Sequence, residues 1–162
     1  MPKPQRAQIS VRPATQDDCR RLWDWRNEST TRAASFNSDF IPYQDHENWF
    51  SRKMRAQDTR IFIVMDADAR EVGYVRFSIE ADEAEISVGV DIAERGKGYG
   101  ADAIRMASDQ ILATGPVDRI LAYIKQDNPA SLAAFQRAGF DSKSIKDVSG
   151  IAAHVMTYRR CP

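Results

Sequence analysis

Alternating apolar and polar positions along the chain predict several short strands. The runs are rich in β-branched and aromatic residues and lie between polar breaks. We expect strands at residues 9–14, 60–66, 71–79, 83–90, 119–125 and 151–160. The short polar segments ADAR and EADE join the second, third and fourth runs, and such connections favour antiparallel hairpins.

Helical spacing of apolar residues appears between these strands. A first helix should follow a capping-box-like pair, Thr15 and Asp18, and carry on one face Cys19, Leu22, Trp23 and Arg26. Further helices are expected over residues 44–56, after Gly100, and over residues 128–140 with Asn128 as the N-cap. Residues 27–43 are polar and are expected to be irregular. This order predicts an α/β (α+β) fold, a mixed sheet with helices on its faces.

Composition narrows the classes of protein that the chain can be. Lys plus Arg and Asp plus Glu both number 23, and this balance argues against a non-specific nucleic-acid binder. We find neither a membrane-length apolar run nor a signal-peptide core, and the two cysteines have no metal-site or redox spacing. We therefore expect a cytoplasmic protein without metal, an N-terminal tail at residues 1–8 and one domain at residues 9–162, as a monomer or homodimer.

Three glycines at the junction between a predicted strand and helix suggest a binding site for an anion. Gly96, Gly98 and Gly100 leave the backbone accessible where the unpaired N–H groups of a helix begin. A Walker A loop fails because Gly98 follows Lys97, and a Rossmann fingerprint fails because the third glycine comes one residue early. A phosphate-binding loop and a glycine loop without a ligand both remain open on these residues alone.

A longer resemblance favours the first alternative. The stretch RGKGYG resembles the R/Q-x-x-G-x-G/A signature of the GNAT superfamily of N-acetyltransferases, and NPASLAAFQRAGF resembles a second element of that family about 30 residues later. The resemblance implies a mostly antiparallel, twisted sheet of six or seven strands flanked by about four helices. It also implies a splay between two strands that holds acetyl-CoA.

The resemblance assigns roles around this cosubstrate. Main-chain N–H groups of the loop would bind the diphosphate, and the Val90 N–H would face the thioester oxygen and stabilise its developing charge. Phe135 stands where many members of the family have a tyrosine that protonates the leaving thiolate. The implied cofactor-binding residues are Val88, Val90, Arg95, Gly96, Lys97, Gly98, Tyr99, Gly100, Asn128, Ser131 and Phe135.

Amine acetylation also needs a group that accepts a proton. Glu85 is our candidate base, Ser131 or water our candidate acid, and Val90 the oxyanion donor. A solvated structural role for Glu85 and a simple capping role for Asn128 are the alternatives.

The N-terminal part is expected to cover the acceptor. It resembles segments of the GNAT branch that acetylates ribosomal-protein N-termini and nucleotide-linked amino sugars, including those of the pseudaminic-acid pathway. The candidate substrate-binding residues are Arg26, Asn27, Arg32, Phe36, Tyr43 and His46, with a buried structural histidine as the alternative for the last. We expect a small-molecule amine, such as one on a nucleotide-sugar, as the acceptor. A protein N-terminus, or acyl-CoA binding without catalysis, are the alternatives.

Overall fold

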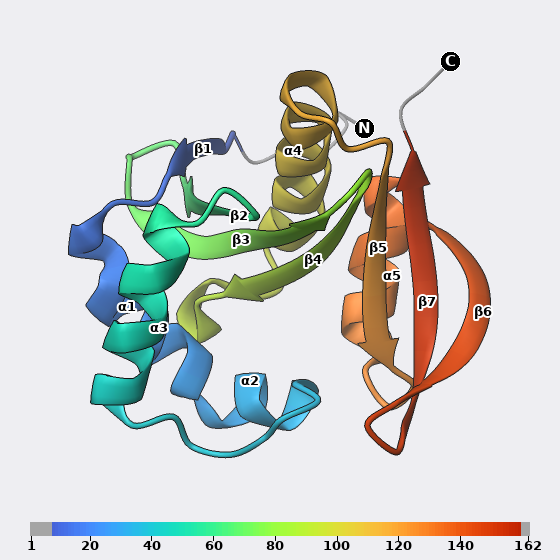
Figure 1. Ribbon diagram of the computed structural model, residues 1–162, viewed down its shortest axis with the longest axis horizontal. Helices are drawn as coiled ribbons and strands as arrows, with labels where there is room; N and C mark the ends of the chain where they lie inside the picture. Colours follow the sequence, from blue (N-terminus) through green and yellow to red (C-terminus); the bar gives the residue numbers. More distant parts are fainter. Residues whose placement is uncertain (1–7, 160–162) are drawn as a thin grey trace, which may run out of the picture.

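A computed structural model describes residues 8–159, which form one twisted seven-stranded sheet (Figure 1). The sheet order is β1-β2-β3-β4-β5-β7-β6, and all neighbours are antiparallel except β4 and β5. The strands are β1 (Ser10–Pro13), β2 (Thr59–Met65), β3 (Glu71–Glu80), β4 (Glu83–Val90), β5 (Arg119–Lys125), β6 (Asp141–Val148) and β7 (Ile151–Arg159). The expected mixed, mostly antiparallel sheet is confirmed.

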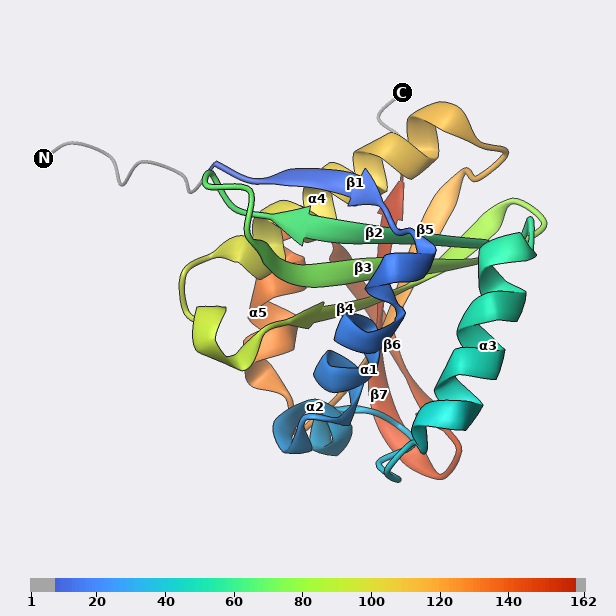
Figure 2. The same ribbon diagram turned by 90° about the vertical axis from the view of Figure 1, so that its left-hand side faces the viewer.

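Helices cover both faces of this sheet (Figure 2). They are α1 (Cys19–Asn27), α2 (Ser29–Ala34), α3 (Tyr43–Arg55), α4 (Tyr99–Thr114) and α5 (Pro129–Ala138), with the short 3₁₀ turns η1 (Gln16–Asp18) and η2 (Ile92–Glu94). The helices α4 and α5 pack on one face, where Phe77, Ile104 and Ile120 are buried. On the other face, α1 and α3 bury Trp25 and Phe50 against Ile63 and Tyr74. The N-terminal and C-terminal halves of the chain thus build opposite layers.

The sequence pattern was wrong on two details of the N-terminal layer. Residues expected to be irregular contain α2, because the Glu28 side chain accepts hydrogen bonds from the first N–H groups of that helix. On α1, Trp25 is buried where the spacing had favoured Trp23, because Trp25 stacks on Tyr74 of the sheet. Both outcomes depend on contacts that helical periodicity does not contain.

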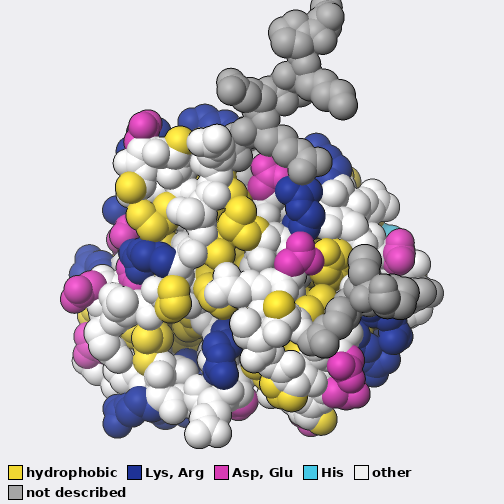
Figure 3. Space-filling view, turned by 90° about the horizontal axis from the view of Figure 1, so that it is seen from above, with side chains coloured by type: hydrophobic (Ala, Val, Ile, Leu, Met, Phe, Trp, Pro, Cys, Tyr) yellow, Lys and Arg dark blue, Asp and Glu magenta, His cyan; other side chains and the backbone are white. Residues whose placement is uncertain are grey.

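The surface is of mixed charge. On the face shown in Figure 3, Lys and Arg side chains are interspersed with Asp and Glu side chains, as expected from the equal totals of 23. Within residues 8–159, no helix has the length and apolar character that a bilayer span requires. The same residues contain no cluster of three or more potential His, Cys, Asp or Glu metal ligands.

Candidate active site

The strands β4 and β5 pair only at one end and then separate. Their parallel ladder joins Glu83 to Arg119, and it ends at the pair Glu85 and Leu121. Beyond that pair, β4 continues to Val90 beside β3 alone, and β5 continues to Lys125 beside β7 alone. The expected splay is therefore present, and it begins at Glu85.

Main-chain donors on β4 point into this splay. The N–H of Asp91 donates to the carbonyl of Val72 on β3 at 2.8 Å. Residues of an antiparallel strand alternate in the direction of their N–H and C=O groups. Val88 and Val90 therefore direct their N–H groups away from β3 and toward β5. The Val90 carbonyl on that side accepts a bond from Arg95 Nε at 3.2 Å.

The glycine turn begins α4 with an open backbone. Gly96 and Gly98 have φ values of +79° and +84°, in the left-handed region where glycine costs least. Apart from the glycine itself and its two chain neighbours, no described atom lies within 4 Å of the position that a Cβ would take at either residue. Gly98 is the N-cap of α4 and provides no side chain to bond the first N–H groups of the helix. These groups thus form an accessible site for an anion.

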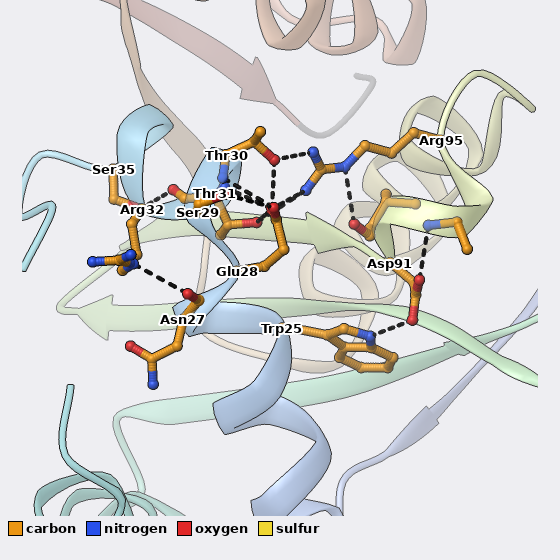
Figure 4. A network of polar contacts seen from close by, with 12 residues as sticks. Trp25, Asn27, Glu28, Ser29, Thr30, Thr31, Arg32, Ser35, Asp91 and Arg95 are labelled. Atoms are coloured by element: carbon orange, nitrogen blue, oxygen red, sulfur yellow. Dashed lines mark hydrogen bonds and ion pairs between the residues drawn. The ribbon is translucent and has the colours of Figure 1, made fainter. Parts of the chain in front are cut away.

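The side chains of this turn are already paired with carboxylates. Lys97 Nζ lies 2.7 Å from Glu94 Oε2. Arg95 reaches across to the start of α2, where its guanidinium bonds Glu28 Oε2 at 3.2 Å and the hydroxyls of Thr30 and Thr31 (Figure 4). An anion at the turn would therefore rely mainly on backbone N–H groups.

Glu28 is the centre of this network. The Thr30 hydroxyl, the N–H groups of Thr30 and Thr31, and the charge of Arg95 together lower the pKa of Glu28 to about 2. At the other end of α2, Lys125 Nζ donates to the carbonyls of Ala33 and Ser35 at 2.9 and 3.4 Å. The short helix is thus attached to both sides of the splay, near its open end (Figure 1).

A second contact ties α1 to the end of β4. Trp25 Nε1 donates to Asp91 Oδ2 at 2.9 Å, and this bond is the main cause that lowers the pKa of Asp91 (Figure 4). A groove of about 180 Å³ lies between these elements, lined by residues that include Trp25, Glu28, Val90 and Arg95. The groove therefore adjoins both the splay and the glycine turn.

The helix α5 supplies the second predicted element. Asn128 Oδ1 accepts the Ser131 N–H at 3.2 Å, so Asn128 caps the helix as expected. Phe135 is 3% exposed and packs edge-on against Phe140, with ring centroids 5.0 Å apart. The phenyl side chain of Phe135 has no proton that it could donate to a leaving group.

The face of β4 opposite α4 carries Glu85 and Ser87. Glu85 is exposed and lies at the vertex of the splay. Ser87 Oγ accepts a hydrogen bond from Arg76 of β3 at 3.3 Å, and the Arg76 guanidinium lies 5.1 Å from the Trp49 ring centroid. Arg26, at the C-terminal end of α1, donates through Nη2 to the Asn37 carbonyl at 3.0 Å.

Several predicted acceptor residues have structural partners. Asn27 forms two bonds with the backbone of Ile41, at 3.0 and 2.8 Å, and Arg32 Nε donates to the Asn27 carbonyl at 3.1 Å. Tyr43 packs edge-on against Trp23 at 5.3 Å. Phe36 is half-buried in the segment after α2. Their roles toward a substrate stay predictions.

His46 lies in the core. It is 4% exposed, its Nε2 is 2.9 Å from the Cys19 carbonyl, and its ring stacks near Phe50. Burial lowers the pKa of His46 and favours the neutral ring. This is the structural alternative described above, and we assign His46 no substrate contact.

Comparison with known proteins identifies the family. The sequence profile described as "Acetyltransferase (GNAT) domain" matches residues 8–141. The chain belongs to this GNAT acetyltransferase family. The family resemblance of the sequence is thus confirmed, whereas the branch within the family stays a prediction.

Individual relatives of this GNAT domain act on different acceptors, according to their names. A mycothiol acetyltransferase of Clavibacter michiganensis subsp. michiganensis is 29% identical over 100 residues, which are 61% of this chain and 30% of that protein. This chain thus spans less than a third of that relative. A spermidine N(1)-acetyltransferase of Vibrio cholerae is 21% identical over 138 residues, which are 83% of this chain and 79% of that protein.

Solved structures agree in fold. The spermidine N-acetyltransferase from Vibrio cholerae, crystallised with CoA and spermine, superposes with a TM-score of 0.84 at 18% identity, over 94% of this chain and 95% of that one. The aminoglycoside acetyltransferase AAC(6')-Ib, crystallised with coenzyme A and kanamycin, gives a TM-score of 0.82 at 17% identity, over 94% and 95% of the two chains. At these identities the likeness shows the fold alone.

Four residues of the candidate site were absent from the sequence-based candidates. Glu28 and Lys125 hold α2, Trp25 holds the end of β4, and Arg76 lies beside Ser87. Of these four, only the position of Arg76 could have been predicted from the sequence. The EADE turn fixes the register of the hairpin formed by β3 and β4, and this register places Arg76 opposite Ser87. The other three depend on contacts between segments far apart in the sequence.

Proposed function

We propose that the protein is an acetyl-CoA-dependent N-acetyltransferase that acts on a primary amine of a small molecule, an amino sugar carried by a nucleotide. The separation of β4 from β5 beyond Glu85 carries this proposal, because it leaves the N–H groups of Val88 and Val90 directed into a gap. Membership of the GNAT family and the open helix start at Gly98 support the same conclusion.

The residues present fit the cosubstrate. The backbone N–H groups of residues 95–100 would bind the diphosphate, since Gly96 and Gly98 leave open space where side chains would otherwise lie. The N–H groups of Val88 and Val90 would donate hydrogen bonds to the pantetheine arm of acetyl-CoA. Asn128 and Ser131, at the start of α5, would contact the cosubstrate from the other side, and Phe135 would pack beside its sulfur. When bound, acetyl-CoA supplies an activated acyl group as a thioester.

The protein's own groups would then direct the transfer. The Val90 N–H would donate to the oxygen on which negative charge develops, the interaction that preorganised donors provide in acyl transfer. Glu85, exposed at the vertex of the splay, lies five residues along β4 from Val90, or about 16 Å at roughly 3.3 Å per residue, and would accept the proton of the attacking amine through a chain of waters. Ser131 or water would protonate the departing thiolate. A thiol pKa of about 8.5 makes that thiolate a fair leaving group without a tyrosine.

Replacing Glu85 tests the proposed base. We expect Glu85→Gln to lower kcat by about 10²-fold and to alter the limb of the pH–rate profile that reports the base, since a positioned base contributes about 10²–10⁴-fold. Glu80→Gln, at the end of β3, is the matched control. Equal kcat values and pH profiles for both variants would remove Glu85 from this role.

An assay of free thiol release tests the function itself. Acetyl-CoA is combined with UDP-linked amino sugars, free amino sugars, polyamines, aminoglycosides and peptides with a free N-terminus. We expect turnover with the nucleotide-linked amine; turnover of peptides alone would favour protein N-terminal acetylation.

Acyl-CoA binding without catalysis is the second candidate, and the buried Phe135 favours it because the usual acid is missing. Tight CoA binding by calorimetry, with no thiol released by any amine, would select this candidate.

A further inference from the structure

Two arginines on the proposed acceptor side, Arg26 and Arg76, have no carboxylate partner among the described residues. Seven of the other described arginines do form an ion pair with a carboxylate, namely Arg12, Arg20, Arg21, Arg70, Arg95, Arg105 and Arg119. Within residues 8–159, no ion pair involves Arg26 or Arg76. Arg26 in addition has a buried Nη1 for which the described residues provide no hydrogen-bond partner.

These arginines lie around one buried tyrosine. Burial lowers the pKa of Arg26 most strongly, and the positive charges of Arg76 and Arg32 lower it further. Burial raises the pKa of Tyr74, whereas the charges of Arg76 and Arg26 oppose that rise. Arg76 shares a face of β3 with Tyr74. Arg26 follows Trp25, whose ring stacks on Tyr74, so both arginines come from positions beside this tyrosine. An uncompensated cation in a partly buried position is unfavourable unless an anion completes the site.

The position of Arg76 connects this charge with the proposed chemistry. Its Nη2 bonds Ser87 on β4, and side chains on the same face of a strand recur every second residue. Ser87 thus shares its face with Glu85, the proposed base. The Trp49 ring beneath the Arg76 guanidinium fixes the arginine and adds a flat surface beside it.

We propose that Arg26 and Arg76 form an anion subsite that binds a phosphate or carboxylate group of the acceptor amine. The inference rests on the proposed function and deepens it, because it names the chemical class that the acceptor must carry. It also predicts discrimination against polycationic amines, such as the spermine and kanamycin of the compared structures, since like charges at the subsite repel them.

A matched series of amines tests this subsite. Glucosamine, glucosamine 6-phosphate and UDP-glucosamine carry the same amine with different charge, and muramic acid adds a carboxylate. For the wild-type protein we expect kcat/KM at least tenfold higher for an anionic member than for glucosamine, with spermidine below both. A preference for glucosamine 6-phosphate or UDP-glucosamine would indicate a phosphate subsite, and a preference for muramic acid would indicate a carboxylate subsite.

Variants separate the subsite from general damage. Arg76→Gln and Arg26→Gln should raise KM for the anionic amine about tenfold or more, and the ratio of kcat/KM for the anionic amine to that for glucosamine should fall by about the same factor. Arg52→Gln, an exposed arginine of α3, is the control and should leave both amines unaffected. Arg76→Glu should reduce the preference for the anionic amine over glucosamine further. It should also raise the rate with spermidine relative to the rate with the anionic amine.

A binding measurement keeps the proposal testable without turnover. Calorimetry with UDP-glucosamine should give a Kd at least tenfold weaker for Arg26→Gln than for wild type, while CoA binding stays unchanged. Equal affinities, no binding to the wild-type protein, or spermidine as the best acceptor would each overturn the anion subsite. The first two results leave the acetyltransferase proposal intact if another amine is acetylated, whereas absence of CoA binding would defeat that proposal instead.

Discussion

The segment from β4 to α5 and the segment from α1 to α3 build their parts of the site in different ways. In the first, a strand, a glycine turn and a helix follow one another directly, so neighbours in sequence are neighbours in space. In the second, the important contacts span the chain: Arg95 bonds Glu28, Trp25 bonds Asp91, and Lys125 bonds Ala33. The proposed cofactor side is thus locally encoded, whereas the proposed acceptor side is held in place by contacts with the rest of the fold.

The largest effect should come from filling the glycine turn, which tests whether local geometry alone sets the cofactor side. Gly98→Val places a branched Cβ in space that is open in the free protein and, by our proposal, taken by the diphosphate. We expect the Kd for CoA, measured by calorimetry, to weaken about 100-fold, because about two charge-assisted hydrogen bonds would be lost.

Gly150→Val is the matched control for that variant. Gly150 has φ +83° and open space around its Cβ position, but it lies in the turn between β6 and β7. Both variants should lose about 1–2 kcal/mol of folding stability from the strained backbone. If both weakened CoA binding equally, the glycine turn would have no special role.

The same contrast explains what the sequence could and could not predict. The glycine turn was predictable from the contiguous motif RGKGYG, and the splay was implied by the family resemblance that this motif and the element NPASLAAFQRAGF carry. The helix α2 was not, because its cap depends on Glu28, which Arg95 bonds from 67 residues away. The choice between Trp23 and Trp25 was decided by Tyr74 and Asp91, which helical periodicity cannot indicate. The contacts of the side chains on the proposed acceptor side therefore could be seen only in the folded arrangement.

A middle-sized effect should follow from cutting the link between the two segments. Arg95→Ala removes the bonds to Glu28, Thr30 and Thr31. It also removes the bond to the Val90 carbonyl, but it leaves the backbone N–H groups of the turn. We expect KM for the acceptor to rise about five- to tenfold, equivalent to about 1 kcal/mol, with the Kd for CoA changed less than threefold.

The companion variant is Lys97→Ala, which removes only the pair with Glu94 on the same turn. It should leave KM for the acceptor unchanged. If Arg95→Ala weakened CoA binding as much as acceptor binding, the guanidinium would belong to the cofactor side, and the division between the two segments would fail there.

The smallest effect should be a pH dependence confined to the acceptor side. Burial lowers the pKa of His46, so the unfolded state binds more protons once the pH falls through the ordinary histidine pKa of about 6.5. The stability that depends on the neutral ring is present above that pH and is lost on acidification. We expect His46→Gln to show a smaller fall in Tm between pH 7.5 and pH 5.5 than wild type. Each kcal/mol corresponds to about 2–4 °C in a chain of this size.

Phe50→Leu separates charge from packing in that experiment, since Phe50 stacks near His46 and is fully buried but does not titrate. Its Tm should be lower than wild type at both pH values, with the wild-type difference between them. If His46→Gln kept the full wild-type pH dependence, the hydrogen bond from α3 to Cys19 would not be the acid-sensitive contact of the α1–α3 layer. The stability of the long-range contacts on the proposed acceptor side would then not depend on the protonation state of His46.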